Sequence, residues 1–189
     1  GSIWLRNGDF LKMKLHIGCG QKFLSGYKHL DVIPYEHVDY ECDARELNLI
    51  GDAVASEIYA CHILEHVKRN EVVKVLSEWH RVLMPGGVLR IAVPDFSAIV
   101  AEYSRDGDLS RLLGLLYGGQ TYDYNYHHVA FDFEMIVSLL EGVGFLEIAR
   151  YDWKEFLPPE YDDYSRAYLP HMDFENGRQM SLNVIAIKK

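Results

Sequence analysis

Three apolar segments of the sequence each end in residues that could bind a nucleoside. Residues 15–17 run into Gly18-Cys19-Gly20, and a Gly-x-Gly turn lets the backbone approach a ligand closely because glycine has no Cβ. Asp31 and Asp43 directly follow two further apolar segments. At the ends of successive strands, such acids can accept hydrogen bonds from ribose hydroxyls and from an adenine amine. Each feature alone is also common in plain turns, so the inference rests on their combination.

The elements that must position these residues alternate between strands and helices. Strands are expected at 12–17, 27–30, 38–42, 54–60, 88–93, 145–151 and 181–188, and helices at 70–83, 96–103, 109–117 and 132–143. In the first helix, Val72, Leu76, Trp79 and Leu83 share one face. Pro85-Gly86-Gly87 is expected to end that helix and turn the chain into the fifth strand.

This alternation predicts an α/β protein with a mostly parallel sheet. The last two strands lack a helix between them, so one of them is expected to be antiparallel. The stretch 152–180 between them is too long for a simple hairpin, and loops of that length are usually functional or disordered.

Composition narrows the class of protein. The 189 residues suit one domain, and we expect it to span 12–189, with 1–11 as an expression remnant or N-terminal extension. The net charge of −9 disfavours nucleic acid and anionic membranes as partners. No apolar stretch is long enough for membrane insertion. Three cysteines without CxxC spacing indicate a reduced, cytoplasmic protein without a cysteine-rich metal site.

Longer motifs carry a family resemblance. The segments YACHILEHV (59–67) and RVLMPGG (81–87) follow the glycine turn and the two acids in order, and Val93-Pro94-Asp95 and the closing Ser181-Leu182-Asn183-Val184 extend the pattern. The sequence resembles class I S-adenosylmethionine (SAM)-dependent methyltransferases. More narrowly, it resembles a small group of predicted methyltransferases associated with surface-glycan synthesis.

The resemblance implies a Rossmann-like sheet of seven strands in the order 3-2-1-4-5-7-6, flanked by helices, with strand 7 antiparallel. It implies that SAM is the cofactor, with S-adenosylhomocysteine as product. The residues implied to bind it are Gly18, Cys19, Gly20, Asp31, Asp43, Ala44, Cys61 and His62. One departure is that only ten residues separate Gly20 from Asp31, which leaves no room for a long helix.

Methyl transfer to a hydroxyl benefits from a general base, and histidine is the commonest choice. The resemblance places the family's motif histidine at His127, completed by Phe131. Our hypothesis is that His127 is the base, with Asp95 or Gln120 as a polar partner; the alternative is that it only orders its loop. His66 is expected either to belong to the site or merely to pack the helix start. No distinctive ligand cluster is seen, so no metal is predicted.

Tyrosines gather at 117–126 and 151–168, and such rings suit the faces and hydroxyls of sugars. The expected substrate-binding residues are Gln120, Tyr122, Tyr126, His128, Asp162 and Asp163. The favoured function is methylation of a sugar hydroxyl, for example on a deoxyhexose such as rhamnose. Two alternatives are methylation of another small metabolite and a non-catalytic SAM-binding module. Fusion to, or action with, glycosyltransferase domains is a further expectation.

Overall fold

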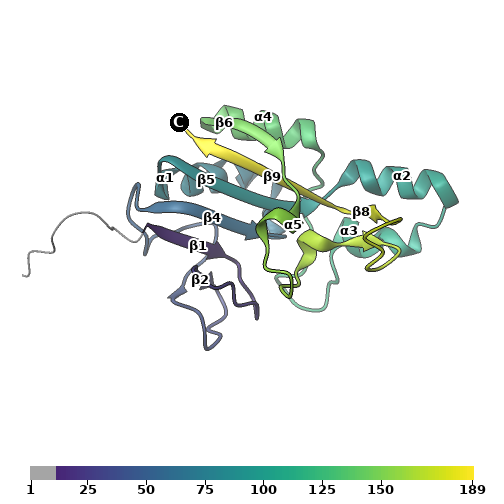
Figure 1. Ribbon diagram of the computed structural model, residues 1–189, viewed down its shortest axis with the longest axis horizontal. Helices are drawn as coiled ribbons and strands as arrows, with labels where there is room; N and C mark the ends of the chain where they lie inside the picture. Colours follow the sequence, from purple (N-terminus) through teal and green to yellow (C-terminus); the bar gives the residue numbers. More distant parts are fainter. Residues whose placement is uncertain (1–11) are drawn as a thin grey trace, which may run out of the picture.

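A seven-stranded mixed sheet forms the centre of the molecule. The computed structural model describes residues 12–189, so the expectation for 1–11 lies outside the described residues. The strand order is β3-β2-β1-β4-β5-β9-β6 (Figure 1). The strands are β1 Met13–Ile17, β2 Lys28–Asp31, β3 Tyr40–Glu41, β4 Ala55–Cys61, β5 Leu83–Pro94, β6 Phe145–Arg150 and β9 Ser181–Lys188. Only β9 runs antiparallel to its two neighbours. The predicted fold class and topology are confirmed, with β9 as the seventh strand.

Helices α1 (Val72–Val82) and α4 (Phe133–Val143) cover one face of the sheet (Figure 1). The main apolar core lies between these helices and the sheet, and Trp79 of α1 is fully buried in it. Helices α2 (Phe96–Asp106) and α3 (Leu113–Tyr117) extend beyond the carboxyl end of β5. In the described part of the chain, no helix has the length and apolar character needed to cross a membrane.

The structure corrects several predicted bounds, two of which change the description of the fold. The expected helix 109–117 is split into a 3₁₀ turn, Ser110–Leu112, and the short α3. The Pro85-Gly86-Gly87 segment does not stop α1, because α1 already ends at Val82 and β5 begins at Leu83. The segment instead forms a bulge: β4 pairs Ala55 with Leu83 and then Glu57 with Val88.

No helix lies between β1 and β4, which agrees with the short spacing from Gly20 to Asp31. Side chains of α1 and its C-terminal turn satisfy the backbone of the loop that follows β3 instead. Trp79 Nε1 donates to the Ala44 carbonyl at 2.8 Å, and Arg81 donates to the Leu47 and Ile50 carbonyls at 3.1 Å. Polar backbone groups near the core therefore find partners without a helix.

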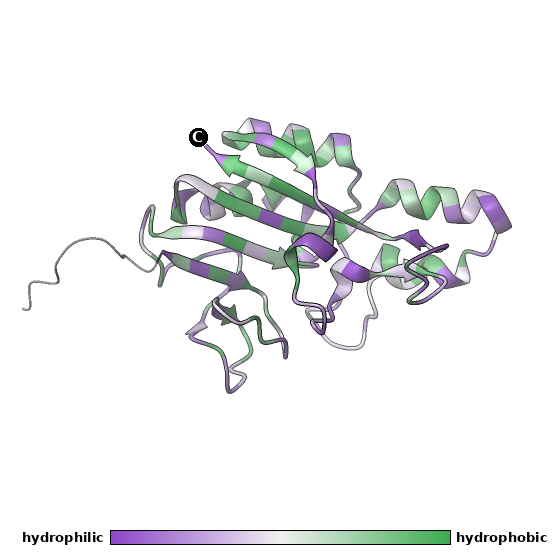
Figure 2. Ribbon diagram, viewed as in Figure 1, coloured by the Kyte–Doolittle hydropathy of each residue, from purple (hydrophilic) through white to green (hydrophobic). Residues whose placement is uncertain are grey.

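The segment 152–180 packs on the opposite face of the sheet, near the carboxyl ends of the strands. It contains α5 (Trp153–Phe156), a 3₁₀ turn (Tyr164–Arg166) and a small hairpin of β7 (Tyr168–Leu169) and β8 (Arg178–Gln179). Figure 1 shows it lying across the carboxyl ends of the strands, and Figure 2 shows mixed apolar and polar positions along it. Trp153 and Leu157 form an apolar cluster with Tyr59 of β4. The long stretch is thus an ordered covering layer.

Candidate functional site

The turn after β1 and the acid that ends β2 form one unit. Gly18 and Gly20 both have positive φ angles, +63° and +55°. The Gly20 amide donates to Asp31 Oδ2 at 2.8 Å, and the Ile33 amide donates to Asp31 Oδ1 at 2.9 Å. Asp31 is buried, and these two donors fix its carboxylate while leaving further acceptor positions on both oxygens.

The two glycines of this turn differ in their surroundings. A Cβ atom added at Gly18 would lie 2.1 Å from Cδ1 of Ile63, which follows β4. A Cβ atom at Gly20 would have nothing within 4 Å. A side chain at Gly18 would therefore displace Ile63 at the next strand end, whereas Gly20 borders open space that a ligand could fill. This edge therefore combines a fixed acid with open space beside it.

Asp43 and Ala44 follow β3 on the same edge. The Arg45 guanidinium donates to both carboxylate oxygens of Asp43, through Nε at 3.0 Å to each and through a terminal nitrogen at 2.6 Å to Oδ2, and this pairing lowers the pKa of Asp43. The carboxylate is therefore ionised, and Arg45 already uses part of its hydrogen-bonding capacity. The backbone carbonyl of Ala44 accepts a hydrogen bond from the Trp79 indole.

The cysteines of the edge remain protonated thiols. Burial, and then the charge of Asp31, raise the pKa of Cys19 to about 12. Burial also raises the pKa of Cys61, whose neighbours include Asp163 of the covering segment. Neither thiol is suited to act as a nucleophile.

His62 is oriented by a chain of polar side chains. Asn183 Nδ2 donates to the Ser165 carbonyl at 3.0 Å, so its Oδ1 is free to accept from the Ser181 hydroxyl at 2.8 Å. The Ser181 oxygen lies 3.0 Å from His62 Nε2. The other ring nitrogen, Nδ1, lies 3.1 Å from Oε1 of Glu65. The closing motif of the sequence therefore supports the turn after β4.

Glu65 is the central acid of this turn. It lies in the 3₁₀ turn Leu64–His66 and is 0% exposed. Burial opposes its ionisation, but the adjacent His62 and then His66 outweigh that effect, and the pKa of Glu65 lies below its ordinary value. Within the described chain, neither carboxylate oxygen has a partner with hydrogen-bond geometry.

His127 reaches this acid from the loop after α3. Its Nε2 lies 4.0 Å from Glu65 Oε1, and its ring lies edge-on to that of His66 with centroids 4.8 Å apart. The Nδ1 atom of His127 lies 2.9 Å from the Leu115 carbonyl, and that of His66 lies 3.1 Å from the Tyr126 carbonyl. The amide of His128 donates to the Glu65 carbonyl at 2.8 Å. The loop is thus bound to the turn after β4 at several points.

The partners expected for His127 are engaged elsewhere. Asp95 caps α2 by accepting from the Ser97 amide at 3.0 Å, and it forms an ion pair with Arg150 at 3.2 Å. The Gln120 side chain is exposed and donates to the Tyr117 carbonyl. The acid beside the His127 ring is Glu65, and not Asp95 or Gln120 as predicted.

The expected substrate residues fall into two groups. Tyr122, Tyr126, His128 and Asp162 are exposed. Asp163 instead accepts from the Ser165 amide at 3.0 Å and from the hydroxyl of the buried Tyr59. Asp163 thus joins the covering segment to the sheet.

Glu65 was not among the predicted site residues, although it stands in the LEHV motif. The usable signal was its spacing: in His62-x-x-Glu65-His66, a single helical turn brings the first histidine and the acid together. The approach of His127 carries no such signal, because 60 residues separate it from this turn.

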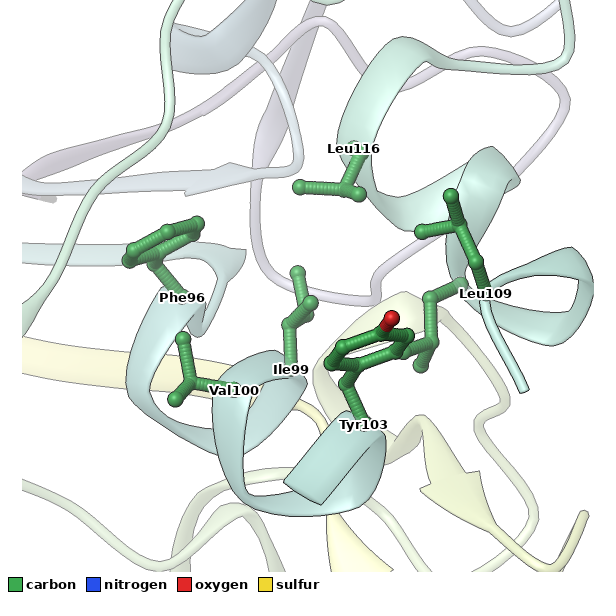
Figure 3. A pocket seen from close by; sticks show the side chains of 7 residues that line it. Phe96, Ile99, Val100, Tyr103, Leu109 and Leu116 are labelled. Atoms are coloured by element: carbon green, nitrogen blue, oxygen red, sulfur yellow. The ribbon is translucent and has the colours of Figure 1, made fainter. Parts of the chain in front are cut away.

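An apolar hollow lies between α2 and the segment that leads into α3 (Figure 3). Its lining is apolar apart from the Tyr103 hydroxyl, and consists of Phe96, Ile99, Val100, Tyr103, Leu109, Leu112 and Leu116. It offers no acid, base or anion-binding group, so it is poorly suited to proton transfer.

Comparison with known families places a methyltransferase signature on this edge. Residues 28–91 match the family model described as a methyltransferase domain. The match runs from β2 through most of β5 and includes Asp31, Asp43 and the Glu65 turn. No match was found among curated proteins.

Solved structures share the fold at low identity. A SAM-dependent methyltransferase from Archaeoglobus fulgidus is 15% identical over 94% of this chain and 86% of its own, with a TM-score of 0.56. A 1,6-didemethyltoxoflavin-N1-methyltransferase from Burkholderia thailandensis, solved with bound S-adenosylhomocysteine, is 18% identical over 94% and 71%, also with a TM-score of 0.56.

A protein from Bordetella parapertussis, described as a possible exported protein, is 14% identical over 93% of this chain, with a TM-score of 0.57. This chain spans only 61% of that protein's length. The fold is that of class I methyltransferases, and the family match supports SAM as the cofactor.

Proposed function

We propose that this chain transfers a methyl group from SAM to a hydroxyl oxygen of a sugar or a similar small molecule. The observation that supports it best is that a glycine turn, an anchored acid and the turn carrying buried Glu65 follow neighbouring parallel strands of one sheet, and that the partly exposed His66 and His127 lie beside Glu65. When bound, SAM supplies a sulfonium methyl group, which the acceptor oxygen takes while the S–CH₃ bonding electrons stay on sulfur.

In this proposal the cofactor lies along the ends of β1 to β4. Asp31 accepts from the ribose hydroxyls with the lone pairs that its two backbone donors leave free. Gly20 provides the open space beside the ligand. Asp43 and Ala44 line the adenine side, and Cys19, Cys61 and His62 line the methionine side.

The acceptor is held by the loop between α3 and His127. Tyr117, Tyr122, Tyr124 and Tyr126 on this loop are all between 41% and 57% exposed. Exposed rings with hydroxyl tips can stack on sugar faces and bind sugar hydroxyls. The net charge of −9 favours a neutral acceptor over a phosphorylated one. Gln120, His128 and Asp162 are the further polar groups proposed to contact it.

The hydroxyl proton must leave as the methyl group arrives. We assign this step to the cluster of Glu65, His66 and His127, because it is the one group of three His, Cys, Asp or Glu side chains gathered this closely in the described residues. His127 is expected to be essential for turnover and dispensable for SAM binding.

The test is an acceptor panel of sugars, amines and carbon acids, with release of S-adenosylhomocysteine as the readout. The proposal expects turnover with a sugar hydroxyl, its loss in His127→Ala, and wild-type turnover in His171→Ala, a change at an exposed histidine outside the site. SAM binding measured by calorimetry should persist in both variants. Turnover with amines alone would refute the hydroxyl acceptor, and full activity of His127→Ala would refute the role of the cluster.

A further inference from the structure

Three potential electron-pair donors converge on one small volume between the turn after β4 and the loop after α3. One ligand atom from each of Glu65, His66 and His127 lies within 4.8 Å of the other two. The three come from two segments about 60 residues apart, so the tertiary fold itself creates the cluster.

Both imidazoles use the same ring nitrogen, Nδ1, to contact a backbone carbonyl. The Nδ1 atoms of His66 and His127 each face a backbone carbonyl, at 3.1 and 2.9 Å. A carbonyl oxygen only accepts hydrogen bonds, so the proton of each neutral ring is assigned to Nδ1 and the lone pair to Nε2. Histidines that ligate metals are typically oriented in this way by a carbonyl bound to the other ring nitrogen.

The third member is a carboxylate with unused acceptor capacity. Glu65 is fully buried, and within residues 12–189 neither of its oxygens makes a hydrogen bond of good geometry. His62 Nδ1 lies 3.1 Å from Oε1. Placing two imidazole lone pairs beside such a group is unfavourable unless a proton or a cation lies between them.

We propose that Glu65, His66 and His127 bind a divalent first-row transition metal ion, with Zn²⁺ the best match. Two imidazoles and one carboxylate suit Zn²⁺, whereas Mg²⁺ and Ca²⁺ prefer oxygen ligands throughout. Tetrahedral Zn²⁺ with bonds of about 2.1 Å needs its ligand atoms about 3.4 Å apart. Small side-chain rotations, chiefly of the half-buried His66, would bring the present spacing into that range.

Three protein ligands leave at least one coordination position open, as in catalytic rather than structural zinc sites. The ion would join the tyrosine-rich loop 117–128 to the turn after β4. If the proposed methyl transfer holds, an acceptor hydroxyl at the open position would lose its proton more readily, because a bound cation lowers the pKa of a coordinated oxygen. His127 would then act as a ligand that positions the acceptor.

The test measures metal binding without any turnover. Full-length protein is stripped with a chelator, and ZnCl₂ and MgCl₂ are titrated in by calorimetry, with bound zinc counted by elemental analysis. We expect one Zn²⁺ per chain and no comparable binding of Mg²⁺. In His127→Ala, His66→Ala and Glu65→Gln, the affinity should fall by about 100-fold or more, since even second-shell changes cost 10–100-fold.

The matched control is His171→Ala, which removes an exposed histidine outside the site and should leave Zn²⁺ binding unchanged. Thermal melting of every variant with and without Zn²⁺ separates a lost ligand from a lost fold: wild type and the control gain stability with Zn²⁺, and folded ligand variants do not. Absence of a Zn²⁺ site in wild type, or undiminished binding in folded ligand variants, would overturn the proposal. Neither result would refute the methyl-transfer proposal, which is tested separately by the release of S-adenosylhomocysteine.

Discussion

Gly18 is the most crowded position of the proposed cofactor turn, and its replacement tests how the strand ends fit together. In Gly18→Ala, the new Cβ would lie 2.1 Å from Ile63 Cδ1, at a φ of +63°. The left-handed backbone costs about 1–2 kcal/mol for a residue with a Cβ, and overpacking adds about 1–3 kcal/mol. We therefore expect a loss of about 2–5 kcal/mol. Gly20→Ala has a similar φ and no neighbour within 4 Å, so it should cost only the backbone part, about 1–2 kcal/mol.

The assay is urea unfolding of wild type, both glycine variants, Ile63→Ala and the double variant Gly18→Ala/Ile63→Ala. Ile63→Ala removes the atoms that Cβ would meet, so in that background Gly18→Ala should cost no more than Gly20→Ala does. The cycle should give a coupling free energy of about 1–3 kcal/mol. Equal costs of Gly18→Ala in both backgrounds would refute the packing argument.

Three further changes test buried polar groups. Burial, and then His29 and His37, lower the pKa of His16 from 6.5 to about 3. As the pH falls below about 6.5, the unfolded state takes up this proton before the folded state does. The stability that a neutral His16 allows is therefore complete above about pH 6.5 and is lost as the pH falls toward 3. In urea unfolding, the free energy of unfolding of wild type should fall by about 2 kcal/mol relative to that of His16→Leu from pH 7 to 5, and a constant difference would contradict this. Asp31→Asn turns an amide NH₂ toward a backbone N–H, so it should cost about 1–3 kcal/mol and weaken SAM binding in calorimetry; unchanged values of both would count against the anchoring role. Glu102 is fully buried and Arg178, which is about half exposed, donates to it at 2.9 Å, so Glu102→Gln should lower stability by about 1–2 kcal/mol, and an unaltered melting temperature would disprove this.

Much of the fold could be predicted from local patterns. The bounds of β9 match the predicted strand, and α4 begins after the expected cap Asp132, which accepts from the Met135 amide, and ends before Gly144. These elements have strong periodicity and clear end signals. The bulge of β5 opposite β4 could not be predicted in this way, because it depends on strand register across the sheet.

The candidate site was only partly predictable. Gly18, Gly20 and Asp31 follow the ends of consecutive strands. Because the carboxyl ends of parallel strands lie at the same edge of a sheet, the sequence predicts that these residues lie close together. Asp95 was expected beside His127 for the same reason, yet its carboxylate is engaged by Ser97 and Arg150. Competition among neighbouring donors decides such pairings, and sequence spacing carries no information about it.

The sequence by itself determined the α/β order, the glycine–acid edge and the absence of a helix between Gly20 and Asp31, because each follows from residues close together in the chain. Only the tertiary structure decided that 152–180 packs on the second face of the sheet, and that His127 meets Glu65 and His66. Those contacts join distant segments, and packing and hydrogen-bond satisfaction of the whole molecule select them. The chemistry assigned to His127 therefore depends on a buried acid that local sequence patterns could not pair with it.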